Sequence, residues 1–303
     1  MKLCDVTVNL AENLVKNQDL IELNDKLDQG KLSKSVGVDS RYWLKGQKLE
    51  DLIFECANSF MKKNQYLAGK TLVVISVNQS GGRRFPGYAN QLQYLLGLAP
   101  DSICIDLNMG CSGFIYASYL MKCIFSQSEN IDYGVILTAD GYSNHIDKDS
   151  TSLLPVFGDA CSLSLLNKSN GYTTFDFLSD GSNYDKLTMN SDQIEMNGQA
   201  VFQFVSFKVS KRLKAFIGVN EKMGIHTLYL HQASKVSIDN LIKILDLEDF
   251  RIPINLHKYG NCTSTSIPLL INDDIKSGLF DGKFIACGFG VGLSYGSMIM
   301  DGK

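Results

Sequence analysis

Short apolar segments rich in β-branched residues alternate along this chain with longer segments in which apolar residues recur every three or four positions. The short segments have the length and composition of buried strands, and the longer ones have the periodicity of helices with one apolar face. Their alternation predicts an α/β fold. In the first part of the chain the predicted strands are 71–77, 103–107, 135–138 and 162–166, and the predicted helices are 49–62, 88–96 and 113–125.

The same succession returns after a polar segment, 167–190, which has the composition of a loop. Cys111 and Asn261 occupy equivalent places, each between a predicted strand and a predicted helix. We therefore predict two similar α/β halves, residues 1–170 and 171–303, which form one rigid body because no proline-rich linker separates them. The later elements are a helix at 199–217, strands at 227–230 and 252–256, a helix beginning near Asn261, and strands at 284–287 and 293–300.

The composition of the chain excludes several classes of function. Hydrophobic residues make up 45% and charged residues 20% of the 303 residues, which is enough apolar surface for a large folded core. The formal net charge of −3 and the lack of a long basic run argue against nucleic acid as a partner. No apolar run has the length of a signal-peptide core or a membrane span, which predicts a cytoplasmic protein without a membrane partner.

The eight cysteines are scattered and include no C-x-x-C pair. This spacing argues against disulfides and against structural zinc, so we expect no metal site. Most of these cysteines lie in apolar segments, where a cysteine is usually a small buried hydrophobic residue. Cys111 differs because it follows a strand and precedes a helix. A helix N-terminus stabilises a thiolate, so we expect a lowered pKa and a nucleophilic role, with a buried structural cysteine as the alternative.

Two further polar residues follow predicted strands, the places where α/β folds often carry functional side chains. His231 is one of four histidines that could act with a reactive cysteine, and His257 is the alternative. Asn261 could donate a hydrogen bond or simply cap the next helix, and Cys262 beside it could compete as the nucleophile. The glycines within 288–296 precede a strand, which argues against a dinucleotide loop and favours backbone N–H groups that form an oxyanion hole.

Three of these segments together resemble the β-ketoacyl-acyl carrier protein synthase III family, a branch of the thiolase-like condensing enzymes. The matches come in the family's order and cover nearly the whole chain. Gly110-Cys111-Ser112-Gly113-Phe114 resembles the family's cysteine motif, His231-Gln232-Ala233-Ser234 its H-Q-A-N motif, and Gly260-Asn261-Cys262-Thr263-Ser264 its G-N-T-S motif. The resemblance implies a thiolase-like fold of two similar α/β halves in a layered αβαβα sandwich, with Cys111, His231 and Asn261 as catalytic residues.

The resemblance also implies a reaction. Cys111 takes an acyl group from a thioester, and His231 and Asn261 hydrogen-bond the carbonyl of a malonyl-thioester. Decarboxylation of that malonyl group gives the enolate that attacks the acyl-cysteine. The backbone N–H groups of Cys111 and Val291 form the expected oxyanion hole. No cofactor is implied, since both substrates are thioesters that acyl carrier protein or coenzyme A carries through phosphopantetheine.

Weaker matches imply further contacts. Phe157-Gly158-Asp159 resembles the family's F-G-D turn, and residues 196–202 resemble its M-x-G-x-x-V-F helix start. Arg84-Phe85-Pro86 resembles a segment that crosses a dimer interface, where its phenylalanine helps to close the partner's acyl pocket. We therefore expect a homodimer. The expected substrate contacts are Phe85, Phe157, Phe202, Ser234 and Gly290.

The chain departs from the family at several positions, which favours a specialised lipid or secondary-metabolite pathway. Ser234 stands where the H-Q-A-N motif has asparagine, Cys262 replaces threonine, and Val291 stands where glycine is usual. Lys31 replaces the tryptophan that holds coenzyme A, and a lysine cannot stack flat on adenine. We therefore predict donors on acyl carrier protein, which is acidic, and a basic docking surface. Its candidate residues are Lys235, Lys208, Lys211 and Arg212, which could equally be solvated helix charges.

Two other functions stay open at this point. One keeps the acyl group on Cys111 but passes it to an alcohol or amine without decarboxylation, although the intact Cys-His-Asn set favours condensation. The other is a non-catalytic partner subunit, which the presence of both Cys111 and His231 disfavours.

Overall fold

Two sets of strands with the same plan form the centre of the molecule. In the computed structural model, which describes residues 1–28, 30, 32–83, 85–190, 192–280 and 282–302, the first set has the order β5-β4-β6-β7-β1 and the second the order β11-β12-β13-β8. The first set comprises β1 (Lys2–Leu10), β4 (Val73–Val77), β5 (Ile103–Leu107), β6 (Tyr133–Asp140) and β7 (Ala160–Asn167). The second comprises β8 (Thr173–Ser179), β11 (Leu228–Leu230), β12 (Lys283–Gly290) and β13 (Ser294–Asp301).

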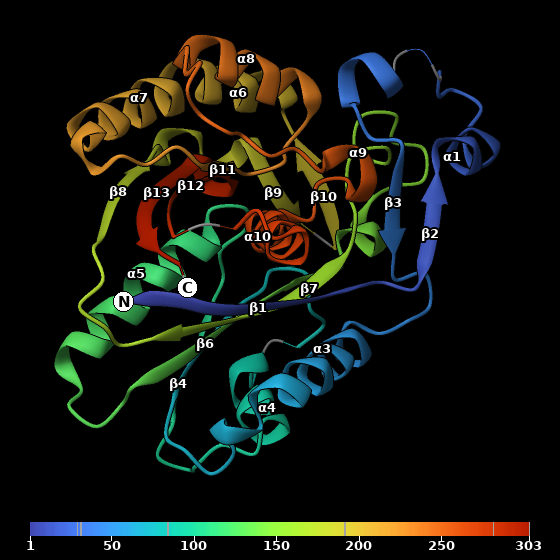
Figure 1. The fold of residues 1–303 in the computed structure, drawn as a ribbon. Helices are drawn as coiled ribbons and strands as arrows, with labels where there is room; N and C mark the ends of the chain where they lie inside the picture. The colour runs from blue at the N-terminus through green and yellow to red at the C-terminus, as the bar shows by residue number, and fades with distance from the viewer. Residues whose placement is uncertain (29, 31, 84, 191, 281, 303) are drawn as a thin grey trace.

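The two sets also share their strand directions. In each, the first strand is antiparallel to the last, β1 to β7 and β8 to β13, and a further neighbouring pair is parallel, β6 with β4 and β12 with β11. The pair Lys2–Asp301 joins the sets, so the two chain ends lie close together (Figure 1). The inner strands are buried along nearly their whole length, as expected for strands covered on both faces.

Helices lie in three layers around these strands (Figure 1). α5 (Gly113–Gln127) and α10 (Ser266–Ser277) lie between the two sets and share one apolar core with both. α3 (Leu49–Asn64) and α4 (Tyr88–Leu95) cover the outer face of the first set. α6 (Gly198–Gln203), the π-helical turn η5 (Phe204–Val209), α7 (Ser210–Val219) and α8 (Lys235–Leu245) cover the second. This αβαβα sandwich confirms the predicted fold class.

Shorter elements form a cap on one side of these layers (Figure 1). An apolar cluster within this cap includes Leu20, Leu32, Trp43, Tyr142 and Leu187. They include the paired strands β2 (Asn13–Lys16) and β3 (Ser40–Trp43), the paired strands β9 (Leu187–Asn190) and β10 (Gln193–Met196), and the helices α1 (Asn17–Leu23) and α9 (Leu256–Tyr259). Single helical turns are η1 (Leu32–Val36), η2 (Gln65–Leu67), η3 (Tyr142–His145), η4 (Gly181–Lys186), η6 (Glu221–Met223), η7 (Thr263–Thr265) and η8 (Val291–Leu293).

Two local predictions are wrong. Segment 167–190 contains β8 and β9, because Phe175 and Phe177 of β8 pack against Tyr119 of α5 with 5.3 and 5.2 Å between ring centres. Segment 252–256 forms no strand, although the structure describes all its residues. A single parallel bridge, between Arg251 and Thr227, pairs the start of this region with the residue before β11. The pairing does not extend further because Pro253 has no N–H to donate to a strand ladder.

The division of the chain into halves at residue 170 falls between β7 and β8. The repeated strand order is compatible with this division, which stays a prediction. Within the described part of the chain, no helix combines the length and apolarity needed to cross a membrane.

Candidate active site

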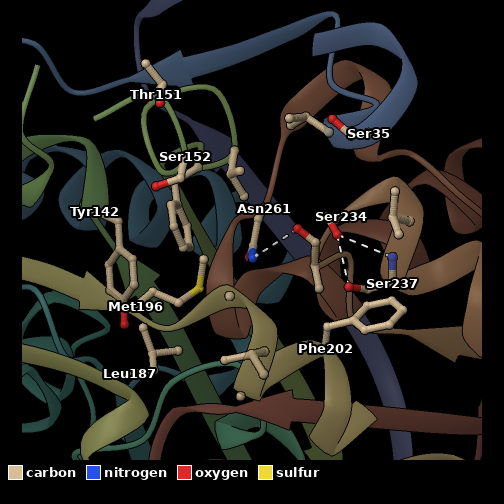
Figure 2. A pocket seen from close by; sticks show the side chains of 18 of the residues that line it. Ser35, Tyr142, Thr151, Ser152, Leu187, Met196, Phe202, Ser234, Ser237 and Asn261 are labelled. Carbon is tan, nitrogen blue, oxygen red and sulfur yellow. Dashed lines mark hydrogen bonds between the residues drawn. The ribbon is translucent and has the colours of Figure 1, made fainter. Parts of the chain in front are cut away.

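A cavity of about 510 Å³ has walls from segments that follow strands of both sets, from the end of β12 and from the cap (Figure 2). Cys111, His231 and Asn261 all line it, although they are distant in the sequence. Cys111 precedes α5, His231 follows β11, and Asn261 precedes η7 and α10. Much of the wall is apolar, with Leu27, Leu32, Val36, Tyr142, Val156, Phe157, Leu187, Met196, Val201, Phe202 and Phe289. A thiol, an imidazole and a carboxamide therefore share one largely apolar chamber.

The Cys111 thiol lies at the N-terminus of α5, enclosed by glycine-rich backbone. The residue is 5% exposed. Gly290, at the end of β12, lies directly against it, because a Cβ added there would come within 3.1 Å of the Cys111 Sγ. A Cβ at Gly288 would come within 2.7 Å of the Cys111 carbonyl oxygen. The C-terminal end of β12 can therefore approach the Cys111 sulfur only because Gly288 and Gly290 lack side chains.

The predicted lowering of the Cys111 pKa is wrong. Burial, with the nearby Asp140 carboxylate as the second cause, raises the pKa of this thiol to about 12. A helix N-terminus stabilises an anion by only about 0.3–1 kcal/mol at an exposed site, which is less than the cost of removing water from a thiolate in an apolar chamber. The thiol is therefore neutral in the resting protein and must lose its proton when it reacts.

The His231 ring is also buried and uncharged. It is 1% exposed and lies edge-on to Phe289, with 5.3 Å between ring centres. Its backbone N–H donates to the Cys287 carbonyl at 2.9 Å, which anchors the residue to β12. Burial lowers the pKa of the imidazole to about 3. Its Nδ1 has no hydrogen-bond partner among the described residues. A neutral imidazole has one N–H to donate and one nitrogen that can accept a proton.

Hydrogen bonds hold Asn261 at both its backbone and its side chain. The backbone N–H donates to the Val156 carbonyl at 2.8 Å, and the carbonyl accepts from the Gly158 N–H at 3.1 Å. The side-chain Oδ1 accepts from the Thr263 N–H at 2.9 Å. The Nδ2 group makes only a long contact, 3.5 Å, to the Ala233 carbonyl (Figure 2). The amide therefore presents its donor group to the cavity.

The competing assignments are contradicted by position. Asn261 is not the N-cap of α10, a place that Thr265 occupies. Cys262 is not among the described residues that line the cavity, and it packs against Ala160 and Leu269. His257 is exposed on α9 and is also outside that set. No group of three or more His, Cys, Asp or Glu side chains in the described part of the chain is arranged to hold a metal ion.

Four of the five predicted substrate contacts line the cavity: Phe157, Phe202, Ser234 and Gly290. Ser234 also caps α8, because its Oγ accepts from the Ser237 N–H at 3.4 Å. Helix capping gives serine a structural role at the place where the family motif has asparagine. Phe85 is not among the described lining residues and is 88% exposed. Its neighbour Arg84 lies outside the described residues.

Val291 borders a smaller, adjacent cavity of about 220 Å³, whose wall shares Tyr142 and Leu187 with the larger one. The Val291 side chain lies against the turn that carries the thiol, since a Cβ at Gly110 would come within 3.0 Å of the Val291 Cγ2. The use of the Val291 N–H as an oxyanion donor stays a prediction.

Three of the four predicted docking cations are each paired with an aspartate, and the fourth, Lys211, is exposed on α7. The pairs are Lys235 with Asp239 at 2.6 Å, Lys208 with Asp180 at 2.6 Å, and Arg212 with Asp176. Lys235 lies between Ser234 and Val236, which line the cavity, whereas Lys208 and Arg212 are not among its described lining residues. Lys31 lies outside the described residues. Lys235 is therefore the best placed of the three to meet a carrier at the entrance.

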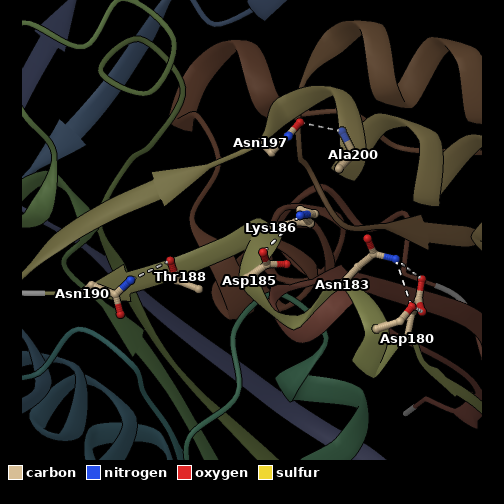
Figure 3. Close-up of polar contacts among 9 residues, drawn as sticks. Asp180, Asn183, Asp185, Lys186, Thr188, Asn190, Asn197 and Ala200 are labelled. Carbon is tan, nitrogen blue, oxygen red and sulfur yellow. Dashed lines mark hydrogen bonds and ion pairs between the residues drawn. The ribbon is translucent and has the colours of Figure 1, made fainter.

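Much of the wall could not be predicted from the sequence, because it comes from irregular segments with no clear periodicity. The missed residues include Leu27, Leu32, Val36, Tyr142, Leu187 and Met196. Local polar contacts hold the segment that carries the last two (Figure 3). Asp180 accepts from Asn183 at 2.9 Å, and the Asn197 Oδ1 accepts from the Ala200 N–H at 3.0 Å, which caps α6. Such contacts depend on loop conformation.

Comparisons with known proteins identify relatives over nearly the whole chain. Residues 105–181 match the family model of 3-oxoacyl-[acyl-carrier-protein] synthase III, and residues 220–301 match the model of its C-terminal part. The β-ketoacyl-[acyl-carrier-protein] synthase III of Streptococcus agalactiae is 28% identical, over 95% of this chain and 94% of its own.

Solved structures show the same fold. A 3-oxoacyl-(acyl-carrier protein) synthase from Burkholderia xenovorans has a TM-score of 0.90 at 26% identity, covering 99% of this chain and 93% of its own. A second crystal structure, of a 3-oxoacyl-(acyl-carrier-protein) synthase III, has a TM-score of 0.92 at 23% identity and covers 99% of both chains.

Proposed function

This chain belongs to the β-ketoacyl-acyl carrier protein synthase III family of acyl-transferring condensing enzymes, and we propose that it joins an acyl group to a malonyl-thioester by decarboxylative condensation. The observation that carries the proposal is the shared cavity, in which Cys111, His231 and Asn261 line one largely apolar chamber. A nucleophile suits the acyl-transfer half of the reaction, and two neutral hydrogen-bond donors suit the decarboxylating half.

In the first half-reaction the Cys111 sulfur attacks the carbonyl carbon of the donor thioester. A C–S bond to Cys111 forms, the C–S bond of the donor breaks, and the released carrier thiol takes up the proton that Cys111 loses. His231, which is uncharged because burial lowers its pKa to about 3, is the base that passes this proton on. The backbone N–H groups of Cys111 and Val291 stabilise the transient oxyanion.

In the second half-reaction His231 and Asn261 donate hydrogen bonds to the thioester carbonyl of the malonyl group. Carbon dioxide leaves, and the electrons of the broken C–C bond become an enolate whose charge lies on that oxygen. Fixed donors stabilise this charge better than water that must reorganise. The enolate carbon then attacks the acyl-cysteine, a new C–C bond forms, and Cys111 leaves as a thiolate that is reprotonated.

Intact-mass spectrometry after incubation with acyl thioesters tests the assignment of the nucleophile. The wild-type chain should gain the mass of one acyl group, Cys111→Ala should gain none, and the control Cys262→Ala should behave as wild type. An adduct that persists on Cys111→Ala would contradict the proposal.

Release of carbon dioxide from malonyl-thioester tests the second half-reaction. Asn261→Ala should still be acylated but should release carbon dioxide roughly 100-fold more slowly, the usual effect of losing one oxyanion donor. Acyl transfer to an alcohol or amine without any carbon dioxide release would instead support the non-decarboxylating alternative.

We propose that acyl carrier protein delivers the donor. The entrance is formed by the exposed residues of the lining, and among the described ones none is aromatic: Lys26, Asp28, Ser35, Thr151, Ser152, Gly198 and Val236. The described entrance thus offers no flat ring on which the adenine of coenzyme A could stack.

We also propose that the enzyme works as a homodimer. β5 lies at the end of its sheet, its outer edge has no partner strand among the described residues, and its side chains are mostly half-buried. Tyr94 of α4, the helix that contacts β5, is 80% exposed, and Phe85, which precedes α4, is 88% exposed. An exposed strand edge with apolar side chains around it favours pairing with a second chain. Sedimentation should give twice the 33.6 kDa chain mass, and a species at 33.6 kDa would contradict the homodimer.

A further inference from the structure

A buried carboxylate lies behind the cavity and has no role in the mechanism above. Asp140, the last residue of β6, is 2% exposed. Its Oδ1 accepts from the N–H groups of Gln79 and Ser80 at 2.9 and 3.1 Å and from the Ser80 hydroxyl at 2.9 Å. No cation pairs with it in the described part of the chain. Burying a carboxylate without a cation is costly and raises its pKa, and these hydrogen bonds offset part of that cost.

The second carboxylate oxygen of Asp140 reaches the other half of the molecule. Its Oδ2 accepts from the Thr263 hydroxyl at 2.7 Å, a contact between residues 123 positions apart. Thr263 has a φ of +48°. A β-branched residue rarely adopts this conformation, which costs about 1–3 kcal/mol and persists only where surrounding contacts impose it. The charge-assisted bond to Asp140 is one such contact.

Thr263 in turn controls the side chain of Asn261. Its backbone N–H donates to the Asn261 Oδ1 at 2.9 Å. With that oxygen occupied, the Nδ2 group is the end of the amide left to donate into the cavity. The contacts therefore run in one line, from the Asp140 carboxylate to the Thr263 hydroxyl, and from the Thr263 N–H to the Asn261 amide.

We infer that Asp140 is a positioning residue, which holds Thr263 in its unusual conformation and thereby orients the Asn261 amide toward the malonyl carbonyl. The inference rests on the proposed function of Asn261. According to this inference, a residue in the half that carries Cys111 orients the Asn261 amide in the other half. A second link one turn away, the 2.9 Å hydrogen bond between the Thr138 and Thr265 hydroxyls, holds β6 to η7 independently.

Three variants and one double variant test the inference. Thr263→Val removes the hydroxyl but keeps the branched shape, Asp140→Asn removes the charge at nearly constant volume, and Thr263→Ser keeps the hydroxyl. Cys111 acylation and malonyl decarboxylation are measured separately for each. Thr263→Val and Asp140→Asn should slow decarboxylation roughly 10- to 100-fold, because misplacement of a catalytic group by about 1 Å has an effect of this size. Acylation should change little in Thr263→Val, and in Asp140→Asn it should be no slower than in wild type, because loss of the carboxylate removes one cause of the raised Cys111 pKa.

The double variant Asp140→Asn/Thr263→Val should be no slower than the slower single variant, since both changes break the same line of contacts. Thr263→Ser should stay close to wild type. The matched control is Thr138→Val, which removes a hydroxyl from the neighbouring link and should leave the ratio of the two rates unchanged. Equal loss of both half-reactions, or effects that multiply in the double variant, would overturn the inference.

Crystal structures of Thr263→Val and Asp140→Asn separate this inference from the proposed function. If wild type releases no carbon dioxide, the proposed function fails, but the structures still show whether the Asn261 amide has moved. A displaced or turned amide in both variants supports positioning by Asp140. An amide that keeps its 2.9 Å bond to the Thr263 N–H in both variants refutes it.

Discussion

Burial keeps both the thiol and the imidazole of the candidate site uncharged at neutral pH. It raises the pKa of Cys111 to about 12 and lowers that of His231 to about 3. Each charged form would lose its hydration in the apolar chamber, and neither residue has an opposite charge beside it to compensate. A resting thiolate–imidazolium pair is therefore disfavoured. In the proposed mechanism, Cys111 loses its proton only when its sulfur attacks the carbonyl carbon of a bound thioester.

The lowered pKa of His231 predicts a pH-dependent stability. Below pH 6.5 the unfolded chain protonates this histidine, whereas the folded chain does not until about pH 3, so the unfolded state binds more protons and stability falls as pH falls through this window. Relative to His231→Gln, wild type should lose about 2 kcal/mol of unfolding free energy between pH 7 and pH 5. Urea unfolding at both pH values measures this difference.

A second buried group titrates in the same range with the opposite sign. Burial raises the pKa of Asp159 to about 6, so its contribution to stability increases as pH falls toward the unfolded value near 4. This contribution is the same in wild type and in His231→Gln, and it cancels in the comparison. Curves that stay parallel from pH 7 to pH 5 would show that His231 can be protonated in the folded protein.

At the scale of elements, the end of β12 determines how closely anything can approach the sulfur. Gly290→Ala adds a methyl group within 3.1 Å of the Cys111 Sγ, which is closer than carbon and sulfur normally approach. We expect this change to slow Cys111 acylation roughly 100-fold, because the thiol must move from its reactive position. The time course of acyl-enzyme formation, followed by mass spectrometry, measures the effect.

Gly198→Ala is the matched control for this prediction. Gly198 also lines the cavity, but a Cβ there would meet no atom nearer than 4.0 Å, and alanine is favourable at the start of α6. It should be acylated at the wild-type rate. Equal acylation rates for Gly290→Ala and wild type would mean that the end of β12 moves to make room for the added methyl group.

At the scale of the whole molecule, the cavity opens beside α8, where an acidic carrier protein would bring its charge close to Lys235. The Lys235 side chain packs over Gly37, near η1, and forms an ion pair with Asp239. Lys235→Glu places two acids together at this entrance. We expect the KM for donors on acyl carrier protein to rise roughly fivefold at low salt, with kcat unchanged, because exposed charges contribute about 1 kcal/mol.

Lys63→Glu is the control for the carrier prediction, since it makes the same charge change on α3, which contributes no residue to the described lining of the cavity. Its KM should equal that of wild type. Added salt should also raise the wild-type KM and reduce the difference in KM between wild type and Lys235→Glu. A Lys235→Glu enzyme with an unchanged KM would exclude this residue from carrier docking.

The sequence by itself determined the alternation of strands and helices, and hence the α/β class, because hydrophobic periodicity is a local property of each segment. It also singled out Cys111, His231 and Asn261, since each follows a segment with the pattern of a strand and short motifs surround it, although the segment before Asn261 forms no strand. These three residues line one cavity in the folded chain.

The tertiary structure alone decided what surrounds those residues. Burial in a cavity that Tyr142, Leu187 and Leu32 also line, from segments distant in the sequence, raises the pKa of the thiol, which the helix N-terminus by itself would have lowered. β8 and the link from Asp140 to Thr263 likewise depend on contacts between distant segments. A local sequence pattern does not encode such contacts, because burial and hydrogen-bond partners between distant segments exist only in the folded chain.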